Sequence, residues 1–205
     1  MKLSLCTASL LLAVGLCLLS APRTGAGADE KKLPEGKSVL TADVIKSTRR
    51  LGGEDNRFCD FKTVEVKDQS FTKAIRAKVK EKPESPWDAQ ISTLTAVPVK
   101  EGDILLVSFW VRTIESKNDG GKGYFSIYFG VPESGLEQSV ADDITVGDKW
   151  KKVQMPARAA ASYESGKAML NFDMGYEPQT LEFGDIQVIN YGDKAKLSDL
   201  PSSGN

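Results

Sequence analysis

Residues 104–114 read Ile-Leu-Leu-Val-Ser-Phe-Trp-Val-Arg-Thr-Ile, and this stretch decides the expected fold. Successive side chains of a β-strand point to opposite faces, so the stretch has two sides of different character. One side is apolar and consists of Leu105, Val107, Phe109 and Val111. The other side is polar and aromatic and consists of Ser108, Trp110 and Arg112. The pattern predicts a strand with one face in a core.

Similar segments recur from residue 58 to residue 192. The expected strands are 61–66, 71–79, 89–99, 104–114, 124–131, 150–155, 168–174 and 181–189. Turn signals such as Lys82-Pro83 and Ser165-Gly166 separate them, and neither a long helical period nor an internal repeat is visible. Short strands at this spacing predict an all-β fold, an antiparallel β-sandwich of jelly-roll type.

The first 28 residues have the features of a signal peptide. Lys2 is followed by an apolar run over residues 3–19, and Ala26-Gly27-Ala28 supplies the small residues that a signal peptidase accepts. We expect cleavage after Ala28 and a secreted or periplasmic protein with no membrane attachment. A membrane anchor is the alternative, which the shortness of the run disfavours. The chain then divides into an N-terminal arm at 29–57, the sandwich at 58–192 and a C-terminal tail at 193–205.

Composition removes several classes of chemistry. The formal net charge is −1 at pH 7, so the chain has no overall attraction for phosphates, and nucleic acid is not an expected partner. Histidine is absent, which excludes serine–histidine catalysis and imidazole zinc sites. Cys59 is the only cysteine left after cleavage, and its neighbours Phe58 and Phe61 predict a buried, inert thiol.

The polar sides of three expected strands carry an unusual combination of side chains. Trp110 and Tyr128 are aromatic, while Arg112, Asn171 and Asp173 bear planar hydrogen-bonding groups. Sugar rings stack on aromatic faces, and planar polar groups bind their hydroxyls. These five residues are therefore the predicted carbohydrate-binding site. Adjoining segments are expected to add Trp87, Gln90 and Gln179.

The tryptophans and the Arg112–Asp173 pair also have a purely structural interpretation. Trp110 is as readily packed under a loop as exposed to a ligand, and Arg112 with Asp173 is as readily a salt bridge. Trp87 is suited to plugging an end of the sandwich, and Trp150 to starting a strand in the core. Joint exposure of Trp110, Arg112 and Tyr128 in one groove would favour the sugar site.

Five segments carry a family resemblance through their order and spacing, namely 86–90, 99–112, 146–153, 170–175 and 180–189. Together they resemble the CenC-type carbohydrate-binding modules of the family 4, 9 and 22 group, which have a galactose-binding-like jelly roll. The likeness covers about residues 60–192. It is nearest to the module that precedes family 10 xylanase-like domains in some secreted bacterial proteins.

The resemblance implies non-catalytic binding of a β-glucan or xylan in a cleft on the concave sheet, accessory to glycoside hydrolysis. The matching cleft positions are Trp110, Arg112, Tyr128, Asn171 and Asp173. The family often carries a structural calcium ion, but its acidic pair before the last strand reads Gly184-Asp185 here, which leaves the metal site open. No cofactor is expected. The expected partner is a polysaccharide or oligosaccharide, and a glycoside hydrolase on a separate chain is a second candidate.

Two other functions stay open at this level. A glycoside hydrolase needs paired carboxylates, and the nearest pair, Glu182 and Asp185, has the wrong spacing. Tyr128 with Arg112 would suit a polysaccharide lyase. The other alternative is an interaction or envelope scaffold that has lost its sugar site, because a fold does not determine a function. We assign no catalytic residue.

Overall fold

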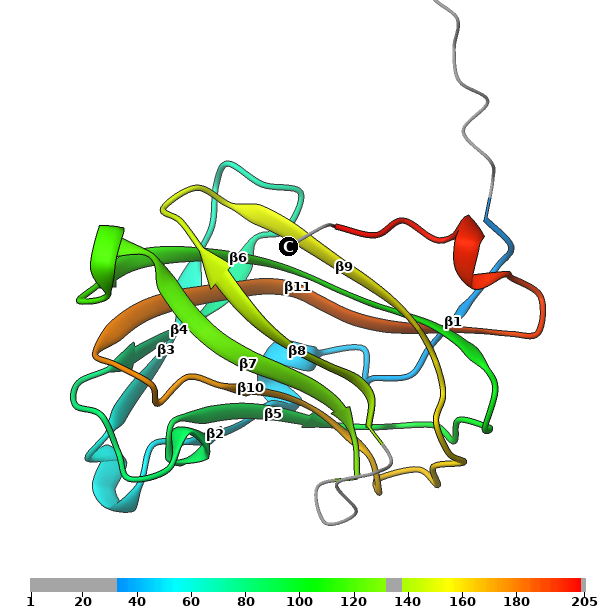
Figure 1. Ribbon diagram of the computed structural model, residues 1–205, viewed down its shortest axis with the longest axis horizontal. Helices are drawn as coiled ribbons and strands as arrows, with labels where there is room; N and C mark the ends of the chain where they lie inside the picture. The colour runs from blue at the N-terminus through cyan, green and yellow to red at the C-terminus, as the bar shows by residue number, and fades with distance from the viewer. Residues whose placement is uncertain (1–32, 132–137, 204–205) are drawn as a thin grey trace, which may run out of the picture. The chain divides into compact units, whose positions relative to one another are not determined.

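The computed structural model describes residues 33–131 and 138–203, which form two packed β-sheets (Figure 1). In order, sheet A consists of β3 (Cys59–Glu65), β4 (Lys73–Val79), β11 (Gln179–Gly192), β6 (Ile104–Ser116) and β9 (Lys151–Arg158), with β1 (Lys37–Ser38) paired to β11. Sheet B consists of β2 (Arg49–Leu51), β5 (Gln90–Leu94), β10 (Met169–Asp173), β7 (Gly123–Gly130) and β8 (Gln138–Val146). All of these pairings are antiparallel, so the predicted all-β antiparallel sandwich is confirmed.

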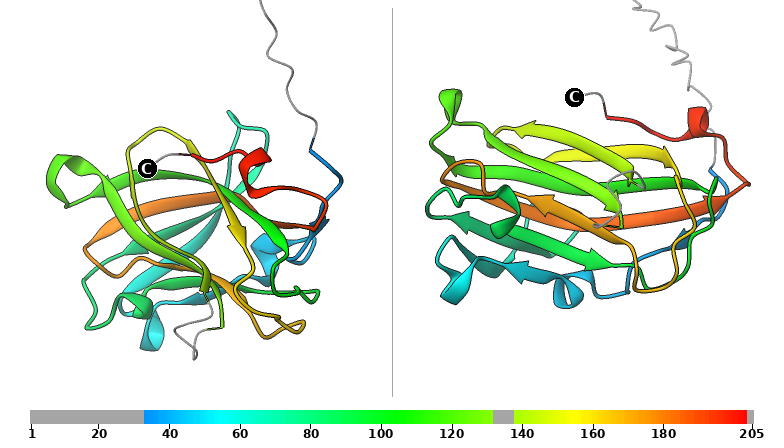
Figure 2. Two further views of the ribbon diagram at one scale, coloured as in Figure 1. Left: turned by 45° about the vertical axis from the view of Figure 1, so that its right-hand side comes forward. Right: turned by 60° about the horizontal axis from the view of Figure 1, so that its bottom comes forward.

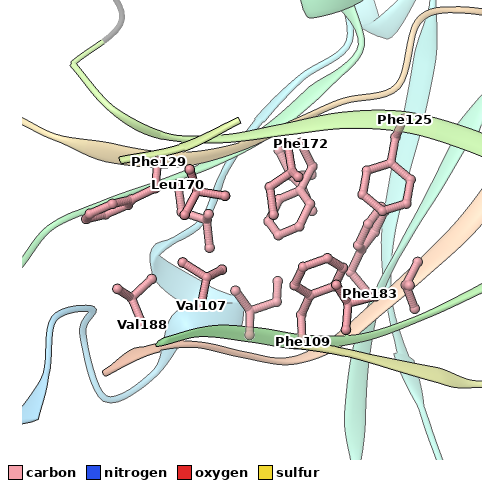
Figure 3. Packing of buried hydrophobic residues seen from close by; sticks show 14 of the residues in the cluster. Val107, Phe109, Phe125, Phe129, Leu170, Phe172, Phe183 and Val188 are labelled. Carbon is pink, nitrogen blue, oxygen red and sulfur yellow. The ribbon is translucent and has the colours of Figure 1, made fainter. Parts of the chain in front are cut away.

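The core lies between the two sheets and has an aromatic centre (Figure 3). Phe109 and Phe183 from sheet A meet Phe125 and Phe172 from sheet B, and all four are buried. The ring centroids of Phe109 and Phe172 lie 4.9 Å apart, and those of Phe125 and Phe183 lie 5.1 Å apart. Edge-to-face contacts of this kind stabilise a core beyond simple apolar burial. The apolar side predicted for residues 104–114 is therefore confirmed as the core side.

Strand β8 was not predicted from the sequence. It is an edge strand of sheet B that pairs with β7, and its centre is Ala141-Asp142-Asp143. Acidic side chains on an edge strand discourage pairing with a second molecule. They also interrupt the alternation of apolar and polar residues by which a strand is identified in the sequence. Figure 2 shows this edge from two further sides. Because β8 was not expected, the side chains that it contributes to the outer face of sheet B were not expected either.

The described part of segment 29–57 joins both sheets, although an arm lying over the domain was expected. Strand β1 pairs with β11 of sheet A, and β2 pairs with β5 of sheet B. Val39 and Leu40 between them are buried in the core. The short helix α1 (Val44–Ser47) follows Asp43, whose side chain accepts a hydrogen bond from the Lys46 N–H. The predicted signal peptide and its cleavage site lie outside the described residues.

The connections and the C-terminal tail are also ordered by specific contacts. Single-turn 3-10 helices lie at η1 (Glu54–Asn56), η2 (Pro86–Asp88), η3 (Asp119–Gly121) and η4 (Leu197–Asp199). After η4, Leu200 packs in a small second cluster with Ile104 and Tyr191. The Ser203 N–H then donates to the Gln154 carbonyl over 2.9 Å. The tail therefore packs along β9 at one side of sheet A.

Two smaller expectations concern the thiol and the membrane. Cys59 is buried on β3, as predicted, and burial raises the pKa of its thiol to about 12. Such a thiol is protonated at neutral pH and is a poor nucleophile. In the described part of the chain, no helix is long and apolar enough to cross a membrane.

Candidate functional site

The structure divides the predicted site residues between opposite sides of the sandwich. Trp110 and Arg112 lie on β6 in sheet A, whereas Tyr128, Asn171 and Asp173 lie on β7 and β10 in sheet B. Both groups point away from the shared core, so the full thickness of the molecule separates them. The expectation that they form one groove was wrong. Alternation correctly gave the side of each strand that faces outward, but it contains no information on which sheet a strand joins.

The outer face of sheet B carries a continuous cross-strand row. Through the strand register, Leu51 is paired with Gln90, Gln90 with Asp173, Asp173 with Ser126, and Ser126 with Asp143. Side chains that are paired across adjacent strands lie close enough to interact. Gln90 donates from Nε2 to Asp173 Oδ1 over 2.6 Å, and Ser126 donates from its hydroxyl to Asp143 Oδ1 over 2.5 Å. The row thus forms a polar floor across β5, β10, β7 and β8, with the apolar Leu51 at its β2 end.

A hollow of about 550 Å³ lies over one half of this floor. Its lining residues are Leu51, Trp87, Gln90, Tyr128, Gln138, Met169 and Asp173. We call this hollow the sheet B groove. It contains four of the predicted site residues, and Asn171 lies beside Asp173 on the same strand. Leu51, Met169 and Gln138 are additional members for which the sequence offered no signal.

Trp87 is the most exposed aromatic side chain of the sheet B groove, with 59% of its surface accessible. It lies in η2, where Pro86 opens the turn and accepts hydrogen bonds at its carbonyl from the N–H groups of Ala89 and Gly175. Gly175 passes so close that an added Cβ would come within 2.7 Å of the Pro86 carbonyl oxygen. The ring is therefore exposed on a loop that backbone hydrogen bonds hold in place. A tryptophan that closed one end of the sandwich would instead be mostly buried.

The carboxyl group of Asp173 is almost completely buried on the groove floor. The residue is 8% exposed, and burial raises the pKa of its carboxyl above the ordinary value, an effect that the hydrogen bond from Gln90 opposes. Burial also raises the pKa of the neighbouring Tyr128 hydroxyl, with a further contribution from the charge on Asp173. A carboxylate with one protein donor keeps acceptor positions for further hydroxyl groups.

Asn171 is fully buried, yet neither its amide nitrogen nor its amide oxygen has a hydrogen-bond partner of normal geometry among the described residues. Its cross-strand neighbours are Ser92 on β5 and Tyr128 on β7. Leaving a buried amide unpaired costs about 1–3 kcal/mol, and such groups are rare in folded proteins. The neighbour within reach is the Tyr128 hydroxyl, whose pKa a hydrogen bond from Asn171 lowers against the effect of burial, so the amide next to Asp173 is incompletely satisfied.

The other half of the floor ends in a tyrosine cluster. The rings of Tyr124 and Tyr176 meet edge to face at 4.7 Å, and the hydroxyls of Tyr176 and Ser126 are hydrogen-bonded. Ser126 in turn contacts Asp143 on β8. Burial, followed by the hydrogen bond to Asp143, raises the pKa of the Tyr124 hydroxyl. These polar aromatics extend the row beyond the groove, and Asp143 was missed because β8 was missed.

On the outer face of sheet A, Arg112 is part of a self-contained ion-pair network. Arg76 binds Oε1 of Glu182 through Nε at 2.8 Å and Nη2 at 2.5 Å. Arg112 binds Oε2 through Nε at 2.8 Å and Nη2 at 2.7 Å. The Glu182 side chain is fully buried beneath the two guanidinium groups. The predicted salt-bridge alternative for Arg112 was right in kind, but its partner is Glu182 and not Asp173.

Trp110 is packed beneath a loop residue instead of standing free. The ring of Phe71 lies 6.2 Å from that of Trp110 and 5.2 Å from that of Trp150, and the Arg112 guanidinium lies 4.7 Å above the Trp150 ring. Phe71 reaches this position because Gly184 leaves room, since an added Cβ would come within 2.2 Å of the Phe71 ring. The rings of this cluster contact one another and the Arg112 guanidinium, so Trp110 does not stand free as a platform for a ligand.

Gln179 is also committed to the fold. It is buried at the start of β11, where its Oε1 accepts from the Tyr124 N–H at 2.8 Å and its Nε2 donates to the carbonyls of Tyr124 at 2.6 Å and Met174 at 2.9 Å. The side chain thereby joins sheet A to β7 of sheet B. Its predicted role in ligand binding is replaced by a structural one, because the amide oxygen and both amide N–H groups already form hydrogen bonds within the protein.

The possibility of a metal site was left open by the sequence. Across residues 33–131 and 138–203, no three side chains of the His, Cys, Asp and Glu types come together. At the position of the family's acidic pair, Asp185 accepts a hydrogen bond from Gln187 Nε2 over 2.5 Å. The described carboxylates in this region are thus engaged with protein donors.

The chain matches no protein-family model and no curated protein sequence. Among solved structures it is similar to the CBM22-1 and GH10 modules of Clostridium thermocellum endo-1,4-β-D-xylanase 10B complexed with xylohexaose. The TM-score is 0.54 and the sequence identity is 15%. The match covers 80% of this chain and 30% of that chain. It is also similar to the N-terminal cellulose-binding domain of Cellulomonas fimi β-1,4-glucanase C, with a TM-score of 0.50 and 10% identity over 76% of this chain and 94% of that chain. At these identities the likeness establishes a fold of the carbohydrate-binding-module type.

Proposed function

We propose that the protein binds a polysaccharide of the β-glucan or xylan class in the sheet B groove without cleaving it. The observation that carries this proposal is the exposed Trp87 ring beside a buried, hydrogen-bonding floor. In this arrangement the ring stacks on the apolar face of a sugar, while the floor binds the hydroxyl groups on its edge. The fold shared with carbohydrate-binding domains supports the assignment.

The roles of the floor residues follow from their hydrogen-bond capacity. Asp173 accepts from sugar hydroxyls with the acceptor positions that Gln90 does not use. Tyr128 both donates and accepts at the groove wall. Asn171 is the cross-strand neighbour of Tyr128. Its amide, which lacks a hydrogen bond of normal geometry, favours the entry of a water molecule or a hydroxyl when the groove is occupied.

The carboxylates of this face favour binding over hydrolysis. Asp173 on β10 and Asp143 on β8 flank Ser126 on β7 in the same row. Two strand spacings separate their backbone positions by about 10 Å. Retaining glycosidases hold their two carboxyl groups about 5–5.5 Å apart, which is much closer. In addition, Asp143 is engaged with Ser126 and Asp173 with Gln90.

The wider biological setting is part of the proposal. The protein is exported after removal of residues 1–28, belongs to the CenC type of module and needs no cofactor. It holds a polysaccharide for a glycoside hydrolase carried on a separate chain. For this attachment to raise the local concentration of the enzyme on its substrate, the two chains must also bind each other.

Affinity electrophoresis tests the proposal with a matched pair of tryptophan variants. The purified protein is run through gels that contain xylan, mixed-linkage β-glucan, a soluble cellulose derivative or no polymer. We expect retardation in at least one polymer gel, relieved by the matching oligosaccharide. Trp87→Ala is expected to weaken binding by about thirtyfold, the effect of losing a central aromatic contact. Trp110→Ala, on the opposite face, is expected to bind like the parent.

Three outcomes contradict this proposal. The first is an absence of retardation in every polymer gel, which would favour the scaffold alternative. The second is a loss of binding in Trp110→Ala with Trp87→Ala unaffected, which would return the site to sheet A. The third is release of reducing ends from the retained polymer, which would make the protein an enzyme.

A further inference from the structure

The outer face of sheet A has a basic character that the outer face of sheet B lacks. One cross-strand row reads Lys62, Arg76, Glu182 and Arg112 through the pairings of β3, β4, β11 and β6. On sheet B the row that ends in Asp143 carries no cation, and the adjacent outward row carries one, Arg49 on β2. The formal net charge of the whole chain is −1, so the cations of sheet A are a local concentration and not a general property.

Two adjoining hollows lie over these cations. The first, of about 390 Å³, is lined by Asp60, Lys62, Arg76, Lys78, Ile114, Glu115 and Thr180. The second, of about 340 Å³, is lined by Lys78, Val79, Lys80, Glu115, Lys117, Pro178, Gln179 and Thr180. They share Lys78, Glu115 and Thr180, so together they form one elongated depression. We call it the sheet A depression.

Several of its cations have no counterion. Lys62, Lys78 and Lys117 form no ion pair with another described residue, whereas Lys80 pairs with Asp60 at 3.1 Å. Arg76 uses Nε and Nη2 on Glu182, so its Nη1 stays available, and 40% of its side chain is exposed. Guanidinium and ammonium groups left in this state are donors for an incoming anion.

The remaining lining indicates which anion fits. Asp60 and Glu115 lie within the same depression, and they repel a dense polyanion such as a nucleic acid or a phospholipid surface. A polyuronate combines its carboxylates with the apolar C–H face of each ring, so an apolar contact beside the cations would favour it over a polyanion that is held by charge alone. Ile114 has 46% of its surface exposed and offers an apolar contact for the C–H face of a sugar ring. Cations and an apolar residue are thus combined along an elongated hollow.

We propose that the sheet A depression is a second carbohydrate site, which binds an acidic polysaccharide through its uronate carboxylates. Lys62, Lys78 and Arg76 bind the carboxylates, and Ile114 contacts the ring between them. This site is independent of the sheet B groove, because the two lie on opposite faces of the sandwich. The protein would then connect a neutral and an acidic polymer.

The test compares polygalacturonate with its fully methyl-esterified form, in which the same chain has lost its charges. We expect the parent protein to bind polygalacturonate and not the ester, and to lose affinity between about 50 mM and about 500 mM salt as the charges are screened. Lys62→Gln combined with Lys78→Gln should weaken binding by about tenfold, since each exposed ion pair contributes modestly. Trp87→Ala should bind polygalacturonate like the parent.

A matched control removes the same charge elsewhere. Lys100→Gln with Lys194→Gln, at exposed positions outside the depression, should bind polygalacturonate like the parent. The proposal is overturned by equal binding of the methyl ester, by an unchanged affinity of the Lys62/Lys78 variant, or by an equal loss in the control. Tighter binding to dextran sulfate or to phosphatidylglycerol vesicles would also overturn it, because either result would indicate a general polyanion surface. Binding of neutral glycan to the Lys62/Lys78 variant reports on the sheet B groove separately.

Discussion

The two outer faces of the sandwich use similar residue types in opposite ways. On sheet A, a tryptophan and an arginine are paired with Phe71, Trp150 and Glu182, so that aromatic and charged groups satisfy one another. On sheet B, Trp87 is exposed and the Asn171 amide is unpaired. Groups that are already satisfied stabilise the fold, whereas exposed rings and unpaired floor groups are available to a ligand. The contrast supports the proposal that the neutral-sugar site lies on sheet B.

The largest expected effect on stability comes from the network of sheet A. Glu182→Ala would leave Arg76 and Arg112 facing each other without their shared carboxylate, and the free energy of unfolding should fall by about 3 kcal/mol. Urea denaturation measures the change. Glu177→Ala is the control, because its pair with Lys82 is exposed and should be worth less than about 0.5 kcal/mol. Equal effects would show that burial of Glu182 does not matter.

A second comparison concerns the stability of the two tryptophan variants. Trp110→Ala removes the contact with Phe71 over the sheet, and we expect a loss of about 2 kcal/mol, less than for a fully buried ring. Trp87→Ala removes an exposed ring, and its effect should stay within about 0.5 kcal/mol. Thermal and urea unfolding of both variants provide the measurement. A larger loss for Trp87→Ala would make that residue part of the core and weaken the groove assignment.

The buried amides of Gln179 and Asn171 test the same difference between fold-stabilising and ligand-binding groups, with smaller changes in the free energy of unfolding. Gln179→Leu breaks three hydrogen bonds and should cost about 1.5 kcal/mol, since backbone groups of Tyr124 and Met174 lose their partner. Asn171→Leu removes an amide whose contact with the Tyr128 hydroxyl is outside normal hydrogen-bond geometry, so its stability should stay within about 0.5 kcal/mol of the parent. Glycan binding should weaken only in Asn171→Leu. Equal destabilisation of the two variants would show that Asn171 is satisfied in solution.

The smallest effect is a pH dependence from Asp173. Because burial raises the pKa of its carboxyl, the folded state binds the proton more tightly than the unfolded state. The contribution of Asp173 to stability is therefore most favourable below the ordinary value of 3.8 and declines as the pH rises through the raised pKa. Asp173→Asn should lack this decline and become relatively more stable than the parent toward neutral pH. Melting curves from pH 3 to about pH 7 test this.

The matched control for this measurement is Asp68→Asn, at an exposed turn position. Its difference from the parent at each pH is the baseline for removing an exposed carboxyl and is subtracted before the Asp173 variant is interpreted. A constant difference for Asp173→Asn after this subtraction would contradict the assignment of the decline to the buried carboxyl.

The strand pattern proved most informative where one face is packed in the core. Residues 107–112 alternate between apolar side chains and polar or aromatic ones, and their apolar side is buried as expected because only that register places Phe109 among the other phenylalanines. Strand β8 escaped prediction because Asp142 occupies a position on its core side, between the buried Val140 and Ile144, and so interrupts the apolar repeat. The groove residues Leu51 and Gln138 escaped because they lie on β2 and β8, neither of which was among the expected strands.

By itself the sequence determined the all-β class, the inward and outward sides of the main strands and the exclusion of histidine chemistry. Those properties depend on local alternation and composition, which are visible in one dimension. Only the tertiary structure decided that Trp110 and Tyr128 lie on opposite faces, that Glu182 joins two arginines, and that Gln179 serves the fold. Sheet membership depends on backbone pairing between strands that are distant in the chain, and backbone hydrogen bonds are the same for every residue type.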